Sequence, residues 1–121
     1  MAPSGSRDAT EAIDRILHAL GDPTRRRIME LLSDRPHSLS ALARPFDMTL
    51  TAVSQHLRIL EDANLVCTQK LGRVRSCQLA AEGLVPLQQW ISDRRSLWQR
   101  RLDRLEDMLV PQETGPVEGQ R

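Results

Sequence analysis

The sequence lacks long apolar runs. No uninterrupted apolar stretch in its 121 residues approaches the ~18 residues that a membrane-spanning helix needs. The opening residues, MAPSGSRDATEA, lack the apolar core of a secretory signal. Two cysteines are too few for a disulfide framework, so we expect free thiols. These absences argue against a membrane or secreted protein and favour a cytoplasmic one with no membrane partner.

The sequence also lacks the residue groupings that are typical of enzymes. It contains no glycine-rich phosphate loop and no paired carboxylates in a pocket-forming arrangement. Ser54 and His56 lie two positions apart, and on a helix their side chains diverge by about 200°, which forbids a nucleophile–base pair. We therefore predict no catalytic residues, no enzymatic activity and no bound cofactor.

The composition suits one small domain with a modest core. Apolar residues make up 40% of the chain and charged residues 27%, which is ordinary for a globular protein. We predict one domain over residues 9–110, flanked by polar tails, residues 1–8 and 111–121, that we expect to be disordered. The net charge of +1 hides local clusters of basic residues at Arg25–Arg27 and between Arg58 and Arg75.

Apolar periodicity and cap residues predict four helices before residue 63, over residues 9–20, 23–32, 39–46 and 50–62. Asp22 followed by Pro23 is a strong start signal, and Ser38 and Thr49 are suited to cap the next two helices. The expected buried positions in the first, second and fourth helices are Ile13, Ile16, Leu17, Leu20, Ile28, Leu31, Leu32, Leu50, Val53, Leu57 and Leu60. A short helix and a tight turn before a longer helix indicate a helix-turn-helix.

The fourth predicted helix has an outer face that suits base reading. Thr51, Gln55 and Arg58 point away from its apolar stripe, with Ser54 at the boundary and His56 on the other flank. Glutamine pairs with adenine and arginine with guanine in the major groove, while hydroxyls suit phosphates or either base. We expect His56 to contact a phosphate or to pack against a neighbouring element.

Negative charge is absent from the middle of this helix. No carboxylate occurs between positions 51 and 58, where one would repel the duplex. Glu61 and Asp62 come only at the far end, where we expect the helix to leave the groove.

Two short, partly β-branched runs, LVCTQK and RVRSCQL, predict a β-hairpin over residues 65–79. With a turn at Leu71-Gly72, Thr68 faces Arg75 and Cys67 faces Ser76. Cys77 then points to the opposite face from Cys67, so a disulfide within the hairpin is unfavourable. We expect Cys77 in the core and Cys67 exposed.

The hairpin gives a winged helix-turn-helix of mainly α class. Its basic residues near the turn are Lys70, Arg73 and Arg75. A long helix then follows over residues 84–109, and its leucine-rich stripe offers more apolar surface than one small core can cover. This apolar stripe by itself favours a homodimer in which a second copy covers it. The alternative is that the long helix folds back on its own domain.

Three stretches carry a family resemblance: ALGDPTRRRIMELL, SLSALARPFDMTLTAVSQHLRILEDANLV and GRVRSCQL. They closely resemble the ArsR-type winged-helix repressor family of bacteria, over roughly residues 9–109. The resemblance implies a homodimer that pairs through its first and last helices, a recognition helix at residues 49–62 and a wing at residues 65–79.

Many members of that family sense metals through cysteine pairs in the third helix or histidine and aspartate sets in the last. Here residues 38–46 and 84–109 contain neither cysteine nor histidine, and His18 and His37 are isolated. Because soft metals need thiolates and zinc needs several convergent ligands, we predict no metal site. A small-molecule effector near Trp90 or Trp98 is left open.

These patterns predict a sequence-specific regulator that binds double-stranded DNA at a pseudo-palindromic operator, most simply a repressor released by a non-metal signal. The alternatives are a protein-interaction module with a winged-helix shape and a redox-responsive repressor that uses Cys67. Activation in place of repression is also open. The predicted DNA contacts are Thr49, Thr51, Ser54, Gln55, His56, Arg58, Lys70, Arg73 and Arg75.

Overall fold

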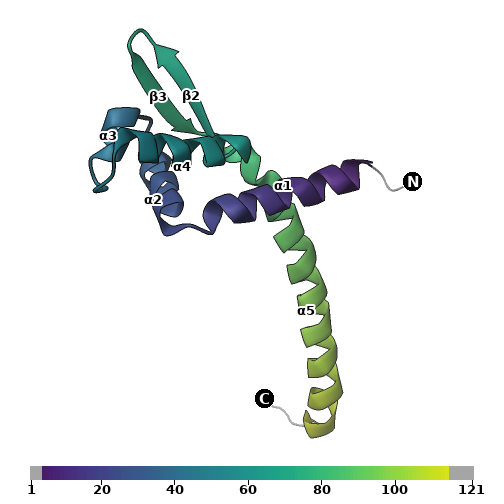
Figure 1. Ribbon diagram of the computed structural model, residues 1–121. Helices are drawn as coiled ribbons and strands as arrows, with labels where there is room; N and C mark the ends of the chain where they lie inside the picture. The colour runs from purple at the N-terminus through teal and green to yellow at the C-terminus, as the bar shows by residue number, and fades with distance from the viewer. Residues whose placement is uncertain (1–3, 115–121) are drawn as a thin grey trace. The chain divides into compact units, whose positions relative to one another are not determined.

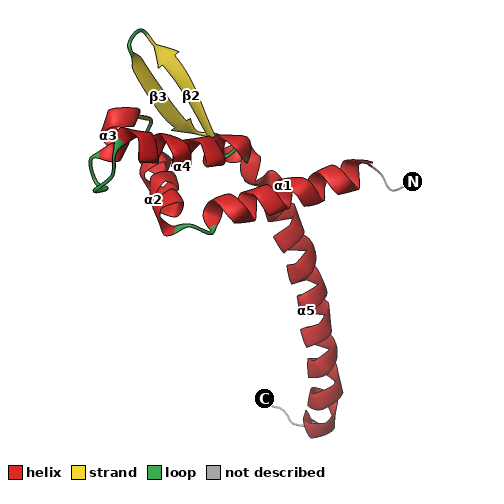
Figure 2. Ribbon diagram, in the orientation of Figure 1, coloured by secondary structure: helices red, strands yellow, loops and turns green. Residues whose placement is uncertain are grey.

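The computed structural model describes the backbone of residues 4–114 and the side chains of residues 7–109. The chain forms two compact units, one that ends at Leu87 and one that begins at Gln88. The elements, labelled in Figure 1 and coloured by type in Figure 2, are α1 (Ser4–Leu20), α2 (Pro23–Asp34), β1 (His37–Ser38), α3 (Leu39–Ala43), α4 (Leu50–Asp62), β2 (Val66–Leu71), β3 (Val74–Leu79), a 3₁₀ helix (Ala81–Leu84) and α5 (Val85–Thr114).

Helices α2, α3 and α4 begin where their cap residues predict. The Asp22 carboxylate accepts a hydrogen bond from the Arg25 backbone N–H at 3.1 Å, and Pro23 follows in the first helical turn. Ser38 Oγ and Thr49 Oγ1 each accept from the backbone N–H three residues later, also at 3.1 Å. Each side chain satisfies one of the N–H groups that a helix start leaves free. All three predicted starts are confirmed.

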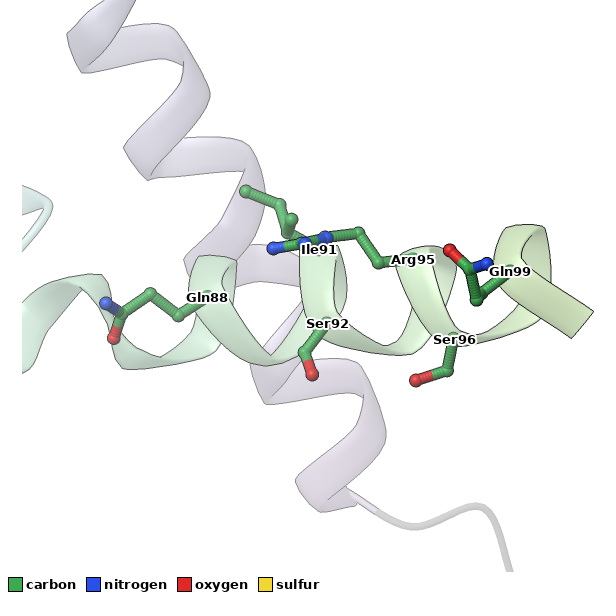
Figure 3. A pocket seen from close by; sticks show the side chains of 6 residues that line it. All are labelled: Gln88, Ile91, Ser92, Arg95, Ser96 and Gln99. Atoms are coloured by element: carbon green, nitrogen blue, oxygen red, sulfur yellow. The ribbon is translucent and has the colours of Figure 1, made fainter.

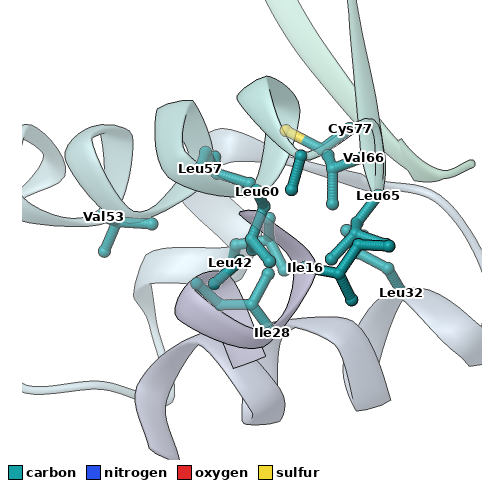
Figure 4. Close-up of a cluster of buried hydrophobic side chains, with 12 residues drawn as sticks. Ile16, Ile28, Leu32, Leu42, Val53, Leu57, Leu60, Leu65, Val66 and Cys77 are labelled. Carbon is teal, nitrogen blue, oxygen red and sulfur yellow. The ribbon is translucent and has the colours of Figure 1, made fainter. Parts of the chain in front are cut away.

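The core of the first unit lies where α1, α2, α3 and α4 meet the base of the hairpin (Figure 4). The predicted mainly helical winged fold is confirmed. Two predicted core positions are wrong, because Leu17 is 53% exposed and Leu50 is 51% exposed. In α1 the buried residue at this level of the helix is Ala19, and Leu17 points to solvent. Leu50 is the first residue of α4 and does not belong to the buried cluster. The largest fully buried side chains are Ile16, Ile28, Leu42, Val53, Leu57, Leu60, Leu65 and Cys77.

The sheet has three antiparallel strands in the order β1-β3-β2. The sequence predicted only the hairpin. The two-residue strand β1 was missed because its pairing with β3, His37 to Cys77 and Ser38 to Ser76, is non-local and leaves no periodic pattern.

The predicted turn of the hairpin is also wrong. Leu71 pairs with Val74, so the turn residues are Gly72 and Arg73. Gly72 has φ +65°, a conformation that glycine adopts without the steric penalty that leucine would meet.

The corrected turn shifts the strand pairing. Thr68 pairs with Cys77 and not with Arg75, and Cys67 pairs with Gln78 and not with Ser76. The pairing moves by two residues. Because side chains alternate between the two faces of a sheet with period two, each residue stays on the face that was predicted for it. Cys77 is accordingly buried and Cys67 exposed, as predicted, and both thiols are free.

Both terminal helices are longer than the sequence predicts. α1 begins at Ser4, and α5 continues through Pro111 to Thr114, so residues 4–8 and 111–114 of the predicted tails are helical. Glycine and serine lower helix propensity without stopping a helix. A proline past the first turn removes one backbone hydrogen bond and crowds the preceding turn, which destabilises a helix, but α5 continues beyond Pro111. Residues 1–3 and 115–121 of those tails lie outside the described residues.

Over residues 88–114 the second unit is formed by α5, and one broad face of this helix is apolar and exposed within the described side chains. Figure 3 shows its polar flank, where Gln88, Ser92, Arg95 and Gln99 line a shallow hollow. None of the helices described here is long and apolar enough to cross a membrane. The exposed apolar side chains of this helix are Val85, Trp90, Ile91, Leu97, Trp98, Leu102, Leu105, Met108 and Leu109.

Candidate nucleic-acid interface

A groove of about 240 Å³ runs between the outer face of α4 and strand β3. The buried stripe of α4, Val53, Leu57 and Leu60, fixes the rotation of the helix and so turns its polar residues outward. The hairpin of β2 and β3 rises next to α4 in Figure 1. Arg75 of β3 is the hairpin residue that lines the groove. The residues that line the groove are Thr51, Ser54, Gln55, Arg58, Glu61 and Arg75.

Five of the nine predicted contact residues therefore come together here: Thr51, Ser54, Gln55, Arg58 and Arg75. All are exposed except Ser54, which is half-buried, as expected for a residue at the boundary of the apolar stripe. The groove thus offers hydroxyls, one amide and two guanidinium groups. Arg58 and Arg75 are 17 positions apart in the chain, and only the folding of the hairpin against α4 places them around one groove.

The other basic residues of the predicted set, Lys70 and Arg73, lie on the hairpin and do not line this groove. Lys70 pairs with Arg75 across the strands, and Arg73 occupies the turn; both side chains are exposed. Thr49 is exposed as well, but its hydroxyl oxygen accepts from the Ala52 backbone N–H and so caps α4.

Glu61 lies in the groove, which the sequence did not predict. Its carboxylate accepts a hydrogen bond of 2.5 Å from Thr68 Oγ1, which ties the end of α4 to strand β2. Glu61 follows Arg58 by three residues, so helical spacing alone places the two on one face. A carboxylate here lowers the positive potential at one end of a groove that two guanidinium groups otherwise dominate.

His56 lies outside the groove, on the flank of α4 that packs against α2. Its side chain is 21% exposed, and its Nδ1 is 3.2 Å from Nη1 of Arg25 and 4.0 Å from Oδ2 of Asp22. Of the two expected roles, the structure shows the packing contact.

The position of Asp22 at the start of α2 affects its ionisation. The Arg25 backbone N–H lowers the pKa of the Asp22 carboxyl, burial opposes this effect, and the nearby Arg25 side chain lowers the pKa further. The result is a pKa below its ordinary value of 3.8, so the carboxylate form is favoured.

The adjacent arginines of α2 have separate partners, and the sequence missed this. Arg25 and Arg26 both donate to carbonyl oxygens at the end of α1; the Arg26 Nη1 to Leu20 O distance is 2.6 Å. Arg27 instead forms an exposed ion pair with Glu30 at 3.3 Å. The available signal was the short Gly21–Asp22 connection, which brings the first turn of α2 back to the free carbonyls of α1.

The remaining titratable groups do not gather into a metal centre. Within residues 7–109, no cluster of three or more histidine, cysteine, aspartate or glutamate side chains could hold a metal ion. Burial raises the pKa of the Cys77 thiol, which makes it a weak nucleophile.

Comparison with known proteins places this chain among transcriptional regulators. A family model described as a helix-turn-helix domain matches residues 20–68. The chain is 42% identical over 89 residues to the HTH-type transcriptional regulator Rv2034 of Mycobacterium tuberculosis, covering 74% of this chain and 80% of that protein.

Solved structures agree with this match. The crystal structure of an ArsR family transcriptional regulator superposes with a TM-score of 0.70 at 39% identity, covering 74% of this chain and 93% of the other. A homodimeric winged helix-turn-helix DNA-binding domain from Mycobacterium bovis gives 0.63 at 25% identity, covering 78% and 93%. That the relatives are transcriptional regulators points to a non-enzymatic, DNA-binding role.

Proposed function

This chain belongs to the ArsR family of DNA-binding winged helix-turn-helix transcriptional regulators, and we propose that it is a homodimeric repressor of its own or a neighbouring operon. The observation that carries the proposal is the groove of Thr51, Ser54, Gln55, Arg58, Glu61 and Arg75. It places hydrogen-bonding side chains on the exposed face of a helix whose opposite face is fixed in the core.

In the proposed complex α4 enters the major groove of the operator. Gln55 would read adenine through its amide and Arg58 would read guanine, since each side chain matches the donors and acceptors of that base. Thr51 and Ser54 would bond to base edges or to the phosphates beside them. The sequence read by one protomer would then be short, and specificity would require two copies.

The hairpin would hold the duplex from the side. Lys70, Arg73 and Arg75 are exposed on β2, the turn and β3, so their charges can reach phosphates that flank the groove. Such contacts add affinity without sequence preference and depend strongly on salt, because each releases counterions. Thr49 and His56 would supplement them from the start and the flank of α4.

A homodimer is supported by the exposed apolar face of α5. Trp98, Leu102 and Leu105 are each more than half exposed, and such a face on a soluble helix normally marks an interface. The M. bovis relative is described as homodimeric. Pairing through α1 and α5 would present two α4 helices about 34 Å apart, one turn of DNA, to a pseudo-palindromic operator.

We further propose that a non-metal signal releases the repressor, because residues 38–46 and 84–109 lack cysteine and histidine. Oxidation of Cys67 is one alternative, favoured by the exposure of that thiol. If oxidation of the wild-type protein leaves its affinity for the operator unchanged, the redox alternative is excluded.

The test is selection of bound duplexes from a random pool, followed by titration of the selected sequence at several salt concentrations. We expect a two-fold symmetric site whose affinity falls steeply with salt. If no duplex is bound in a salt-dependent way, the protein is a winged-helix interaction module and the proposed function is wrong. A reporter gene placed behind the selected site distinguishes repression from activation.

A further inference from the structure

The guanidinium group of Arg25 connects three helices of the first unit. From its place in the first turn of α2, its Nε donates to Ala19 O at 2.7 Å and its Nη2 donates to His18 O at 3.1 Å, both at the end of α1. Its Nη1 lies 3.2 Å from Nδ1 of His56 in the middle of α4. One rigid, planar cation therefore bonds to α1 and α4 at the same time.

The chemistry of these bonds fixes the His56 ring. A guanidinium group only donates hydrogen bonds, so His56 Nδ1 must be the acceptor and the neutral ring must carry its proton on Nε2. Asp22 Oδ2 is 4.0 Å from the same nitrogen, too far for a hydrogen bond, and accepts from the Arg25 backbone instead. Arg25 thus sets both the position and the tautomer of a side chain on the recognition helix.

Apolar packing alone would fix the orientation of α4 less sharply. Leu57 and Leu60 hold α4 on the core by contacts that have little directional preference, whereas a hydrogen bond depends on angle as well as distance. The Arg25 contacts also lie at the negative end of the α1 dipole, where a cation is favoured.

We infer that Arg25 is a positioning residue that sets the orientation of α4 relative to α1, and through it the half-site spacing that the dimer accepts. The inference rests on the proposed function, in which α1 takes part in the dimer and α4 reads the operator. In a two-fold dimer, a change in the angle between α1 and α4 occurs twice, once in each protomer. A small local change would therefore alter the separation of the two recognition helices more than it alters either one alone.

The experiment compares Arg25→Ala and Arg25→Lys with Arg27→Ala. Lysine keeps the charge but cannot bond to two helices with a planar fork, so it should not rescue the alanine variant fully. Arg27 is the matched control, because it is also an arginine of α2 but forms only an exposed ion pair. Each variant is titrated with a duplex holding one selected half-site, and with duplexes holding two half-sites at the selected spacing and one base pair more or less.

We expect the wild type to prefer one spacing sharply. Both Arg25 variants should bind the single half-site within about threefold of wild type but lose about tenfold or more on the full site, a typical cost of losing charge-assisted hydrogen bonds. Their preference among the three spacings should flatten, and Arg27→Ala should behave as wild type. An equal loss on half-site and full site, or an unchanged spacing preference, would overturn the inference.

A second measurement separates this inference from the proposed function. Nitrogen-15 shifts of the His56 ring in the free protein should report the Nε2–H tautomer in wild type and a mixture of tautomers in Arg25→Ala. An Nδ1–H ring in the wild type would refute the Arg25 contact whatever the protein binds. If the ring is as expected but the wild type binds no duplex, the proposed function fails and the spacing role fails with it.

Discussion

Single side chains around α4 divide into those suited to bases and those suited to phosphates. Gln55 and Arg58 line the groove on the exposed face of α4, whereas Lys70 and Arg73 are exposed on the hairpin. The first pair can match hydrogen-bond patterns of particular bases, and the second pair offers charge alone. Truncating the first pair should therefore change base preference, whereas truncating the second pair should change the affinity for all duplexes alike.

We predict that Gln55→Ala and Arg58→Ala each weaken binding to the selected operator by about 1–3 kcal/mol and relax base preference at one position. Lys70→Ala and Arg73→Ala should weaken binding to all duplexes alike and reduce the slope of affinity against salt by about one per lost contact. Titrations with the operator and with a scrambled duplex at several salt concentrations measure both effects. If the Gln55 and Arg58 variants lose the same affinity for the operator and for the scrambled duplex, these residues do not read bases.

Asp22 should make stability depend on pH in the acidic range. Its folded pKa lies below the ordinary value of 3.8, so its contribution is present above that value and is lost as pH falls through the folded pKa. Asp22→Asn keeps a cap residue but removes the titration. We expect this variant to be slightly less stable than wild type at neutral pH and to lose less stability on acidification.

Urea unfolding at about pH 7 and at about pH 3 tests this prediction. The effect should be small, because solvent screens a carboxylate that is partly exposed. Equal losses of stability in the two proteins between these conditions would show that Asp22 is not responsible.

Residue roles could be predicted from the sequence where the partner is close in the chain. Ser38 and Thr49 cap helices through the residue three positions on, and this spacing is visible in the sequence. Arg25 and His56 are 31 positions apart, and Glu61 bonds to a strand residue whose register depends on the turn. No local pattern encodes these two contacts, and the predicted set lacked Arg25. It also excluded Glu61, although the three-residue spacing from Arg58 could have placed Glu61 on the same face of α4.

At the scale of elements, the hairpin shows how one residue decides a register. Periodicity located both strands but could not choose between Leu71-Gly72 and Gly72-Arg73 as the turn. The choice depends on which turn position needs positive φ, and the structure gives that position to Gly72. The starts of α2, α3 and α4 were predictable because caps act locally, whereas the start of α1 and the end of α5 were not, because the residues there lower helix propensity without forbidding helix.

We predict that Gly72→Val destabilises the hairpin by about 1–2 kcal/mol, because a β-branched residue resists positive φ. Space is not the cause, since no heavy atom lies within 4 Å of an added Cβ. Gly72→Asn is the matched control, because asparagine tolerates this conformation and should cost less. Thermal unfolding of the three proteins, with amide exchange in β2 and β3, measures the difference; equal destabilisation by both variants would contradict it.

At the scale of the whole molecule, the proposed function depends on self-association. The apolar face of α5 was predictable from leucine spacing, and in the described chain it is exposed. The sequence could not indicate what covers it, because periodicity shows that a face is apolar and not which surface meets it. A second copy is the occupant that the proposed operator symmetry requires.

We predict that Leu102→Glu weakens self-association at least about tenfold, because a charge replaces an apolar side chain that the proposed two-fold dimer would bury twice, once from each copy. Ser96→Glu, on the polar flank of the same helix, is the control and should leave association unchanged. Sedimentation across a range of concentrations measures the association, and operator titration should show a parallel loss for Leu102→Glu. An unchanged mass would mean that α5 does not form the dimer.

The separation of α4 into a buried stripe and an exposed face also bears on evolution. Val53, Leu57 and Leu60 hold the fold, whereas Thr51, Gln55 and Arg58 contribute nothing to the core. After gene duplication, one copy could therefore acquire a different operator through a few substitutions on the exposed face without losing stability. The same separation would let an engineer retarget the protein by randomising only those exposed positions.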